Sequence, residues 1–283
     1  MAGLIYVISW LPVSLLYVLS WLIFFLFYYV PGYRKKVVYN NLYNAFPEKS
    51  RQELLAIRRR FYRHLSCLFA EVVKILSLSP ENLKRRCKFT AESKELINSY
   101  LQNNKSVIIV MGHYGNWEWC GTSFYVNFGI SSAAVYRPVK NKAFDRLMKR
   151  LRTRLGVNVY PMKDFPRQMF ALRKQTNCII LIADQTPSRT NAHWVEFLNQ
   201  ETPVYKGTAR LSKTFNYPLI FCLPRPVKRG YYEVHAKLIA ETPKEYDEES
   251  ISKMHTRILE EEIIKAPEYW LWTHKRWKHK RSG

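Results

Sequence analysis

The fold is decided by the stretch Val107-Ile108-Ile109-Val110-Met111-Gly112-His113-Tyr114-Gly115-Asn116-Trp117-Glu118-Trp119. Its first five residues are apolar and rich in Val and Ile, which predicts a short strand buried on both faces. Gly112 and Gly115 then permit a tight turn and a close approach of the backbone, and residues 116–128 have a helical pattern. We therefore expect His113 at the carboxyl end of a strand, where open α/β sheets place their ligands.

His113 and Glu118 form a histidine–acid pair within this turn. An imidazole titrates near neutrality, and a carboxylate on its far nitrogen fixes the tautomer and stabilises the imidazolium, so the pair suits a general base. Spacing alone also fits a structural, hydrogen-bonded histidine, because 22 acidic residues and seven histidines produce such pairs by chance. A second pair, His255 with Glu260, follows no strand and has no glycine beside it. We interpret that second pair as part of a solvated helix surface.

Helical and strand patterns alternate from residue 92 onward. The expected strands cover residues 107–111, 133–136, 157–160 and 178–182. The expected helices cover residues 92–102, 116–128, 141–155 and 165–174. This alternation predicts an α/β domain with a largely parallel sheet.

The segment after the last of these strands predicts a loop, a hairpin and a helix. About twenty residues of loop lead to Gly207, which is longer than most structural connections, and long loops at strand ends often line sites. Residues 218–223 and 231–239 predict an antiparallel hairpin. Residues 248–265 predict an amphipathic helix.

The N-terminal segment from Leu4 to Val30 has no charged residue over 27 positions, more than the roughly 20 that span a bilayer core. It lacks a basic leader and a small-residue cleavage pattern, so we expect a retained transmembrane or membrane-anchoring helix. A basic run at residues 34–36 places the rest of the chain on the cytoplasmic side. Pro12 leaves two alternatives open: a kink in this helix, or a segment that enters one leaflet only. The simplest division is an anchor, residues 1–32, followed by one α/β domain, residues 33–283.

The formal charge of +23 and the pI near 9.9 imply a polyanionic partner, which can be nucleic acid, an anionic membrane or a phosphorylated substrate. An aromatic content of 15% favours a membrane interface, and no nucleic-acid-binding motif accompanies the charge. Cations gather on a helix that Ser50 and Glu53 open with a capping box. Its face with arginines at 58–60 and 63 is either solvated or rests on anionic head groups. The tail from Tyr269 to Arg281 mixes aromatic and basic residues in the same way.

Five cysteines are widely spaced and include no Cys-x-x-Cys pair. An odd number without close pairs indicates reduced, mostly structural thiols of a protein that faces a cytoplasm. We therefore expect neither a disulfide framework nor a zinc site.

Polar residues recur where the expected strands end. Arg137 can hold a phosphate with its fork, although a surface ion pair fits equally well. Asp184 can orient a substrate or another side chain, or it can cap the loop. Lys206 and Arg210 flank Gly207 at the start of a helix, which suits anions. One base, one acid and several cations fit transfer chemistry on an anionic lipid.

At this point the residues match a family. The block from His113 to Glu118 resembles the H-x4-D/E motif of the lysophospholipid acyltransferase superfamily, and the whole chain resembles its lipid A biosynthesis branch, the lauroyl/myristoyl acyltransferases. The other matching blocks are Asn41-Leu42, Ala45-Phe46-Pro47-Glu48, Tyr136-Arg137-Pro138, Ala183-Asp184-Gln185, Val195-Glu196-Phe197-Leu198, Gly207-Thr208-Ala209-Arg210 and Trp270-Leu271-Trp272-Thr273-His274-Lys275-Arg276-Trp277.

The resemblance implies a glycerol-phosphate-acyltransferase-like mixed sheet flanked by helices, and a role for each matching residue. His113 would be the general base for an acceptor hydroxyl, and Glu118 would orient the imidazole and stabilise its charge. Arg137 would bind a phosphate of the acceptor or help the oxyanion. Asp184 matches the acid of the Asp-Gln block. Arg137 and Asp184 are therefore candidates for substrate binding, and Asn116, Lys206 and Arg210 are further candidates. The acyl thioester is a cosubstrate, so the resemblance implies no metal and no bound cofactor.

The leading hypothesis is an O-acyltransferase at the bacterial inner membrane with its catalytic domain on the cytoplasmic side. It would move a fatty acyl chain from acyl carrier protein or coenzyme A to a hydroxyl of a phosphorylated lipid A precursor, on an anionic membrane surface and without nucleic acid. The alternatives are the same chemistry on an amino-acid lipid or glycolipid, and a non-catalytic lipid-binding protein. After the Asp-Gln block the branch often has another acid and a glycine, whereas this chain has Thr186-Pro187-Ser188-Arg189. This departure from the family pattern leaves the identity of the acceptor lipid open.

Overall fold

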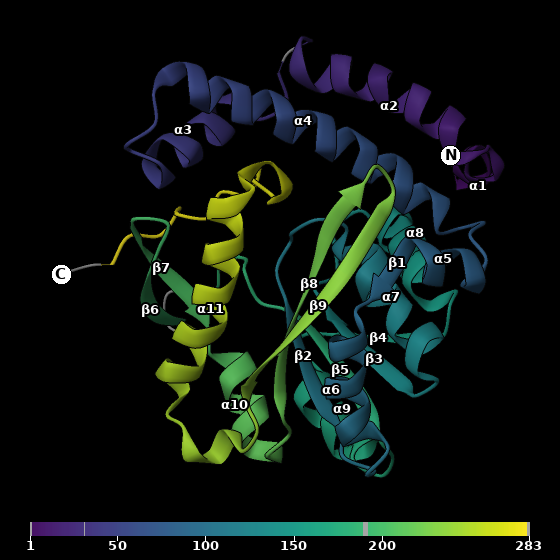
Figure 1. The fold of residues 1–283 in the computed structure, drawn as a ribbon, viewed down its shortest axis with the longest axis vertical. Helices are drawn as coiled ribbons and strands as arrows, with labels where there is room; N and C mark the ends of the chain where they lie inside the picture. Colours follow the sequence, from purple (N-terminus) through teal and green to yellow (C-terminus); the bar gives the residue numbers. More distant parts are fainter. Residues whose placement is uncertain (1, 31, 189–191, 282–283) are drawn as a thin grey trace.

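A seven-stranded sheet forms the centre of the computed structural model, which describes residues 2–30, 32–188 and 192–281 (Figure 1). In spatial order the strands are β1 (Cys87–Phe89), β9 (Tyr231–Ala240), β8 (Leu219–Lys228), β2 (Val107–Met111), β5 (Asn177–Ile182), β3 (Ser131–Tyr136) and β4 (Val157–Pro161). The five strands from β8 to β4 run parallel, whereas β9 is antiparallel to β8 and parallel to β1. The expected mixed, mostly parallel sheet is confirmed.

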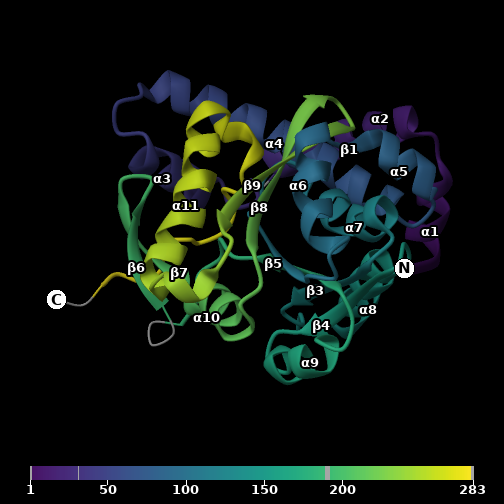
Figure 2. The same ribbon diagram turned by 60° about the horizontal axis from the view of Figure 1, so that its bottom comes forward.

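Strand β2 is buried on both faces, and its side chains alternate between two cores. Ile108 and Val110 face one core, whereas Val107, Ile109 and Met111 face the other. The first core includes α3 (Lys35–Ala45), α9 (Phe165–Leu172), α10 (Lys206–Phe215) and α11 (Glu248–Lys265). The second core includes α5 (Pro80–Arg86), α6 (Ala91–Leu101), α7 (Trp117–Phe128) and α8 (Lys142–Thr153). The sheet therefore lies between two helical layers, and Figure 2 shows α10 and α11 on the opposite side from α6 and α7.

Helix α4 (Arg51–Lys74) lies across the edge at which the parallel strands end (Figure 1). The predicted capping box is confirmed at its start: the Ser50 hydroxyl accepts from the Glu53 amide, and the Glu53 carboxylate accepts from the Ser50 amide at 2.8 Å. The apolar stripe of α4 is buried and includes Leu54, Ile57 and Phe61. This helix thus forms a lid on the edge of the sheet that holds His113.

The expectation of one long N-terminal helix is wrong. The apolar segment forms two helices, α1 (Ala2–Trp10) and α2 (Val13–Tyr28), which are separated at Pro12, where the extended backbone and missing amide hydrogen end α1. In the part of the chain that the structure describes, no helix combines the length and the apolar character needed to cross a membrane. Helix α2 packs on α4 through Leu16, Ser20 and Phe24.

Most of the outer surface of α1 and α2 is apolar and exposed. Nine large side chains on it are each at least 47% exposed: Leu4, Val7, Trp10, Leu15, Val18, Trp21, Leu22, Phe25 and Leu26. Monomeric soluble proteins rarely expose a contiguous apolar area of this kind. The two helices therefore present a surface that suits a lipid phase.

Three other expectations need correction. The loop before Gly207 contains a hairpin of β6 (Ala192–Phe197) and β7 (Gln200–Tyr205). His255 is 3% exposed and points into the core from α11, so it is no part of a solvated surface. The aromatic tail is buried at Trp270 and Trp272, because its indoles pack on one another and under the sheet edge.

The remaining expectations divide between those that the structure covers and those that it does not. The five cysteines are all free thiols, four of them buried, as the spacing predicted. The antiparallel hairpin and the helix over residues 248–265 are confirmed. Arg189, the last residue of the departure after the Asp-Gln block, and residues 282–283 at the end of the expected domain lie outside the described residues.

Candidate active site

The turn after β2 needs glycine at residue 115. Gly115 has a φ of +58°, and a Cβ on it would lie 2.2 Å from the Pro224 carbonyl oxygen. Its amide donates to the Tyr269 carbonyl at 3.0 Å, and the Leu271 amide donates to the His113 carbonyl at 3.1 Å. Residues 269–277, the C-terminal strap, thus hold the catalytic turn from one side.

His113 is oriented by Asp184, which follows the neighbouring strand β5. The Nδ1 of His113 lies 2.5 Å from Asp184 Oδ1, and the backbone amide of His113 donates to Oδ2 at 2.8 Å. Trp270 of the strap donates its indole N–H to the same Oδ2 at 2.8 Å. Since an ionised carboxylate accepts hydrogen bonds, Nδ1 carries the proton and Nε2 is left with a lone pair.

The Nε2 atom of His113 faces the side chain of Gln185. The Gln185 amide nitrogen lies 3.2 Å from it and can donate to the lone pair. The ring also meets Trp117 edge to face, with the centroids 4.9 Å apart. A substrate hydroxyl that displaced the Gln185 amide would find a free base at this point.

Asp184 is buried and ionised. Burial alone would raise its pKa, but the attraction of His113 in its protonated form, the hydrogen bonds from the His113 ring and backbone amide, and the indole of Trp270 hold that pKa well below its usual value. Two neighbouring histidines are neutral near pH 7, because burial lowers the pKa of His255 and of His274 to about 4. The guanidinium of Arg276 is fully buried nearby, and burial lowers its pKa to about 10, so it stays charged.

Glu118 occupies a different place from the one that the sequence predicted. Its carboxylate accepts two hydrogen bonds from Arg152 of α8, at 2.9 Å from Nε and 2.5 Å from Nη2. Burial would raise the pKa of Glu118, but Arg152 lowers it below the usual value. Among the described residues, the carboxylate that contacts His113 Nδ1 belongs to Asp184 rather than Glu118.

A cavity of about 240 Å³ opens beside His113 at the ends of β2, β5, β3 and β4. Its polar residues include His113, Glu118, Arg152, Gln185 and Arg137. Most of its remaining wall is apolar, and includes Gly121, Ala134, Val135, Val157, Ile180 and Ile182. A base at one end of a narrow apolar cavity suits a substrate with a hydrocarbon chain.

The other sequence-predicted residues divide between the cavity and the rest of the molecule. Arg137 is exposed and lines the cavity. Asn116 is fully buried, caps α7 through the Trp119 amide at 2.9 Å, and is held by Glu71 at 2.7 Å.

The two cations at the start of α10 lie apart from the base. Arg210 is exposed and pairs with Glu248 at 3.2 Å. Lys206 begins α10, as the sequence predicted, but the cavity is lined by its neighbour Tyr205.

Three residues of the site were missed by sequence reasoning: Arg152, Gln185 and Trp270. Arg152 lies on an amphipathic helix with five cations, where no spacing distinguishes one arginine from the others. Gln185 adjoins Asp184 at a strand end, which is a signal that could have identified it. Trp270 was included in an aromatic tail, and the tail was expected on a membrane surface.

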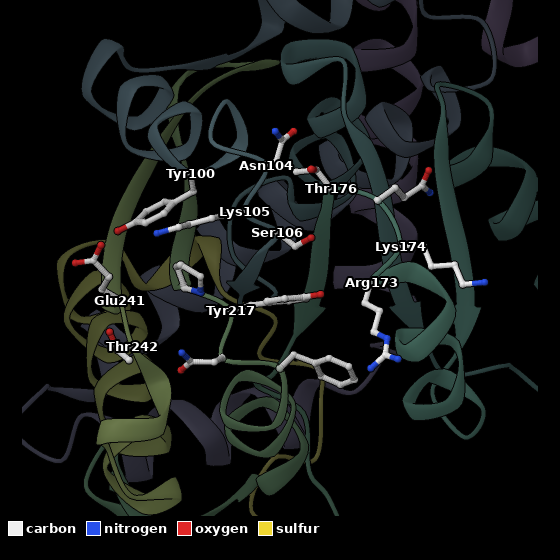
Figure 3. A pocket seen from close by; sticks show the side chains of 14 residues that line it. Tyr100, Asn104, Lys105, Ser106, Arg173, Lys174, Thr176, Tyr217, Glu241 and Thr242 are labelled. Carbon is white, nitrogen blue, oxygen red and sulfur yellow. The ribbon is translucent and has the colours of Figure 1, made fainter.

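A larger hollow, of about 900 Å³, lies at the opposite edge of the sheet (Figure 3). It is formed where β2, β5 and β8 begin, and Lys105, Lys174 and Tyr217 are among its lining residues. No histidine lines its described part. The smaller cavity beside His113 is therefore the candidate active site.

Comparison with known proteins gives the family. Residues 1–279 match the family model described as bacterial lipid A biosynthesis acyltransferase. The chain is 23% identical over 253 residues to a lipid A biosynthesis palmitoleoyltransferase of Escherichia coli (strain K12), a match that covers 88% of this chain and 80% of that protein. It is also 23% identical over 252 residues to a lipid A biosynthesis lauroyltransferase of the same organism, covering 88% and 81%. The resemblance drawn from the sequence blocks is confirmed.

Proposed function

The chain belongs to the bacterial lipid A biosynthesis acyltransferase family, and from that premise we propose that His113 activates a hydroxyl of a lipid A precursor for acyl transfer from a thioester. The observation that carries the proposal is the His113–Asp184 pair, together with the position of the His113 Nε2 atom, which is covered by the Gln185 amide and lies beside a largely apolar cavity. The donor is acyl carrier protein or coenzyme A carrying the fatty acyl chain.

The reaction we propose is a direct transfer. The His113 Nε2 lone pair takes the proton of the acceptor hydroxyl as its oxygen attacks the thioester carbonyl carbon. Asp184 stabilises the imidazolium that results, as its 2.5 Å contact with Nδ1 permits. The carbon–sulfur bond then breaks, and the imidazolium returns the proton to the departing sulfur, so an ester and a free thiol leave.

The acyl chain would lie in the cavity. Its apolar wall excludes water from the hydrocarbon, which favours binding by roughly 0.8 kcal/mol for each buried methylene. Glu118 and Arg152 neutralise one another beside this wall, so neither charge is left unpaired near the chain. Arg137 would contact a phosphate of the acceptor or the oxyanion, and Lys206 and Arg210 would contribute to the positive field at the entrance.

We place the enzyme at the bacterial inner membrane, on the cytoplasmic side. The exposed apolar face of α1 and α2 would rest in one leaflet, and the net charge of +23 would favour both anionic lipid and an acidic carrier protein. A reporter fused after Gly283 is then active in the cytoplasm. Activity of that reporter in the periplasm would contradict this location.

The test of the proposed function is mass spectrometry of the lipids of cells with and without the gene. The proposal expects loss of one secondary acyl chain from lipid A, restored by the wild-type gene and not by a His113→Ala copy. An unchanged lipid A with a change in an amino-acid lipid or a glycolipid would assign the same chemistry to another acceptor. No change in any lipid would favour a non-catalytic lipid-binding protein.

A further inference from the structure

A second groove lies on the other side of the catalytic turn, between α4 and the tip of the β8–β9 hairpin. Figure 1 shows this hairpin reaching to α4, with α2 on the outer side of α4. The groove has a volume of about 360 Å³, which is sufficient for a phosphorylated sugar head group. We call it the hairpin groove and define it by Arg60, Arg63, His64, Lys228 and Arg229.

The hairpin groove is positively charged. It is lined by Arg60, Arg63, Lys228 and Arg229, and the carboxylate of Glu268, which also lines it, pairs with Arg60 at 3.3 Å. No carboxylate of the described residues forms an ion pair with the other three cations. Three cations around one hollow therefore lack a counter-charge, which favours an anion there.

The polar groups at the base of the groove do not compete for that anion. Burial raises the pKa of Glu71, and its carboxyl oxygens accept hydrogen bonds from Tyr17 at 2.8 Å, Tyr232 at 2.7 Å and Asn116 at 2.7 Å. Burial lowers the pKa of His64 to about 4, so this imidazole is neutral near pH 7. The groove therefore keeps the positive charge of its arginines and lysine.

The groove shares a wall with the active site. His64 lies in the groove, and its Nε2 is 3.2 Å from the carbonyl oxygen of Gly115, two residues after His113. The outer end of the groove meets the apolar helix α2. There the guanidinium of Arg63 lies 4.8 Å from the ring centroid of Trp21, and that of Arg229 lies 5.3 Å from the ring centroid of Tyr17. A lipid whose chains lie beside α2 can thus reach the groove and His113 together.

We propose that the hairpin groove binds a phosphate of the acceptor lipid while the hydroxyl of the same lipid lies at His113. This inference rests on the proposed function. Arg63 and Arg229 supply planar forks that match phosphate oxygens, and Lys228 adds a point charge. The groove would then select acceptors that carry a phosphate and fix which hydroxyl reaches the base.

The test compares a phosphorylated lipid A precursor with the same lipid after phosphatase treatment, both in neutral detergent micelles. The readout is the ratio of kcat/KM for the two acceptors. We expect the wild type to prefer the phosphorylated form by at least about 10-fold, the scale of one charge-assisted hydrogen bond, and we expect Arg63→Gln with Arg229→Gln to bring that ratio close to one. The matched control is Lys105→Gln with Lys174→Gln, which removes two cations from the opposite edge of the sheet (Figure 3) and keeps the wild-type ratio.

A vesicle arm distinguishes the acceptor's phosphate from bulk anionic lipid. We call the protein with Arg63→Gln and Arg229→Gln the groove variant. The fraction that sediments with vesicles containing phosphatidylglycerol should agree within about twofold between the groove variant and the matched control, because both lose two charges. Two results would overturn the proposal. One is a groove variant that retains the wild-type preference. The other is a groove variant whose kcat/KM falls equally for both acceptors and whose vesicle binding is also lost, which would mean that the groove binds bulk anionic lipid of the bilayer.

Two further measurements keep the outcome clear. If the double variant has a lowered thermal midpoint, Lys228→Gln at the exposed hairpin tip tests the same preference without touching α2. If the wild type acylates neither acceptor, the proposed function fails, and binding of the two lipids to a His113→Ala protein still tests the groove. A preference for the phosphorylated lipid in binding, lost with Arg63→Gln and Arg229→Gln, would then support the groove alone.

Discussion

At the residue scale, His113 owes its role to three groups that come from distant parts of the chain. Asp184 fixes the proton on Nδ1, Trp270 fixes Asp184, and Gln185 covers Nε2. The sequence identified His113 from its strand and glycines, and it identified Asp184 as a polar strand end. It assigned the orienting contact to Glu118, because the H-x4-E spacing is local, whereas the partner that the structure places there is 71 residues away.

Asp184→Asn tests the orienting contact. An asparagine at this position cannot accept in the same way from Nδ1–H and favours the wrong tautomer, so we expect the transfer rate to fall by at least about 100-fold. Initial rates with a thioester donor measure the effect. Glu249→Gln removes an exposed carboxylate of α11 and serves as the control. A rate for Asp184→Asn within a few-fold of the wild type would contradict the assignment.

Gly115→Ala tests the shape of the catalytic turn. Gly115 and Gly129 both have positive φ, +58° and +65°, but a Cβ on Gly129 meets no heavy atom within 4 Å, whereas one on Gly115 meets the Pro224 carbonyl. Gly129→Ala should thus cost only the backbone strain, about 1–2 kcal/mol. Gly115→Ala should cost more and also reduce transfer, as urea unfolding and initial rates would show. Equal losses of stability for the two variants would contradict the close approach.

At the scale of elements, the strands and helices from residue 91 to residue 182 could be predicted because their patterns are strong and short connections join them. The β6–β7 hairpin was missed, since its strands mix polar and apolar residues without a clear period. The break between α1 and α2 was underestimated: Pro12 was recognised as a possible kink, but it ends the helix. His255 was misplaced because the charged neighbours on α11 concealed one buried face.

Helix α7 sets one wall of the cavity through Gly121, where an added Cβ meets no heavy atom within 4 Å. Gly121→Val should project into this space and shift the donor preference toward shorter acyl chains. Competition between acyl donors of different length measures the shift. The control is Gly207→Val in α10, which also has open space but does not line the cavity. An unchanged chain-length profile for Gly121→Val would mean that the acyl chain lies elsewhere.

At the scale of the whole molecule, the two ends of the chain meet the catalytic turn from opposite sides. Tyr17 of α2 and Asn116 both donate hydrogen bonds to Glu71. In the C-terminal strap, the Leu271 amide donates to the His113 carbonyl, and the Trp270 indole donates to Asp184. The sequence could not reveal these contacts, because they join residues at least 45 positions apart or depend on which aromatic side chains the core accepts. Composition suggested a membrane surface for the tail, whereas packing buries it.

Truncation tests the strap. Among the described residues, ending the chain after Trp277 removes only the exposed or half-buried residues 278–281 and a 3.4 Å surface pair of Arg281 with Glu201, so the transfer rate should change little. Ending it after Tyr269 removes the indole that holds Asp184 and the amide that holds His113, and we expect an inactive, less stable protein. An active protein after the shorter truncation would contradict a role for the strap in the active site.

The central claim is that His113 is the general base of an acyl transfer to a lipid A precursor. Its most direct test is the single-turnover rate of ester formation from an acyl thioester and that precursor, for the wild type and for His113→Ala. We predict that the variant forms ester at least about 100-fold more slowly while it keeps the thermal midpoint and the lipid binding of the wild type. Ester formation at the wild-type rate by His113→Ala would contradict the account.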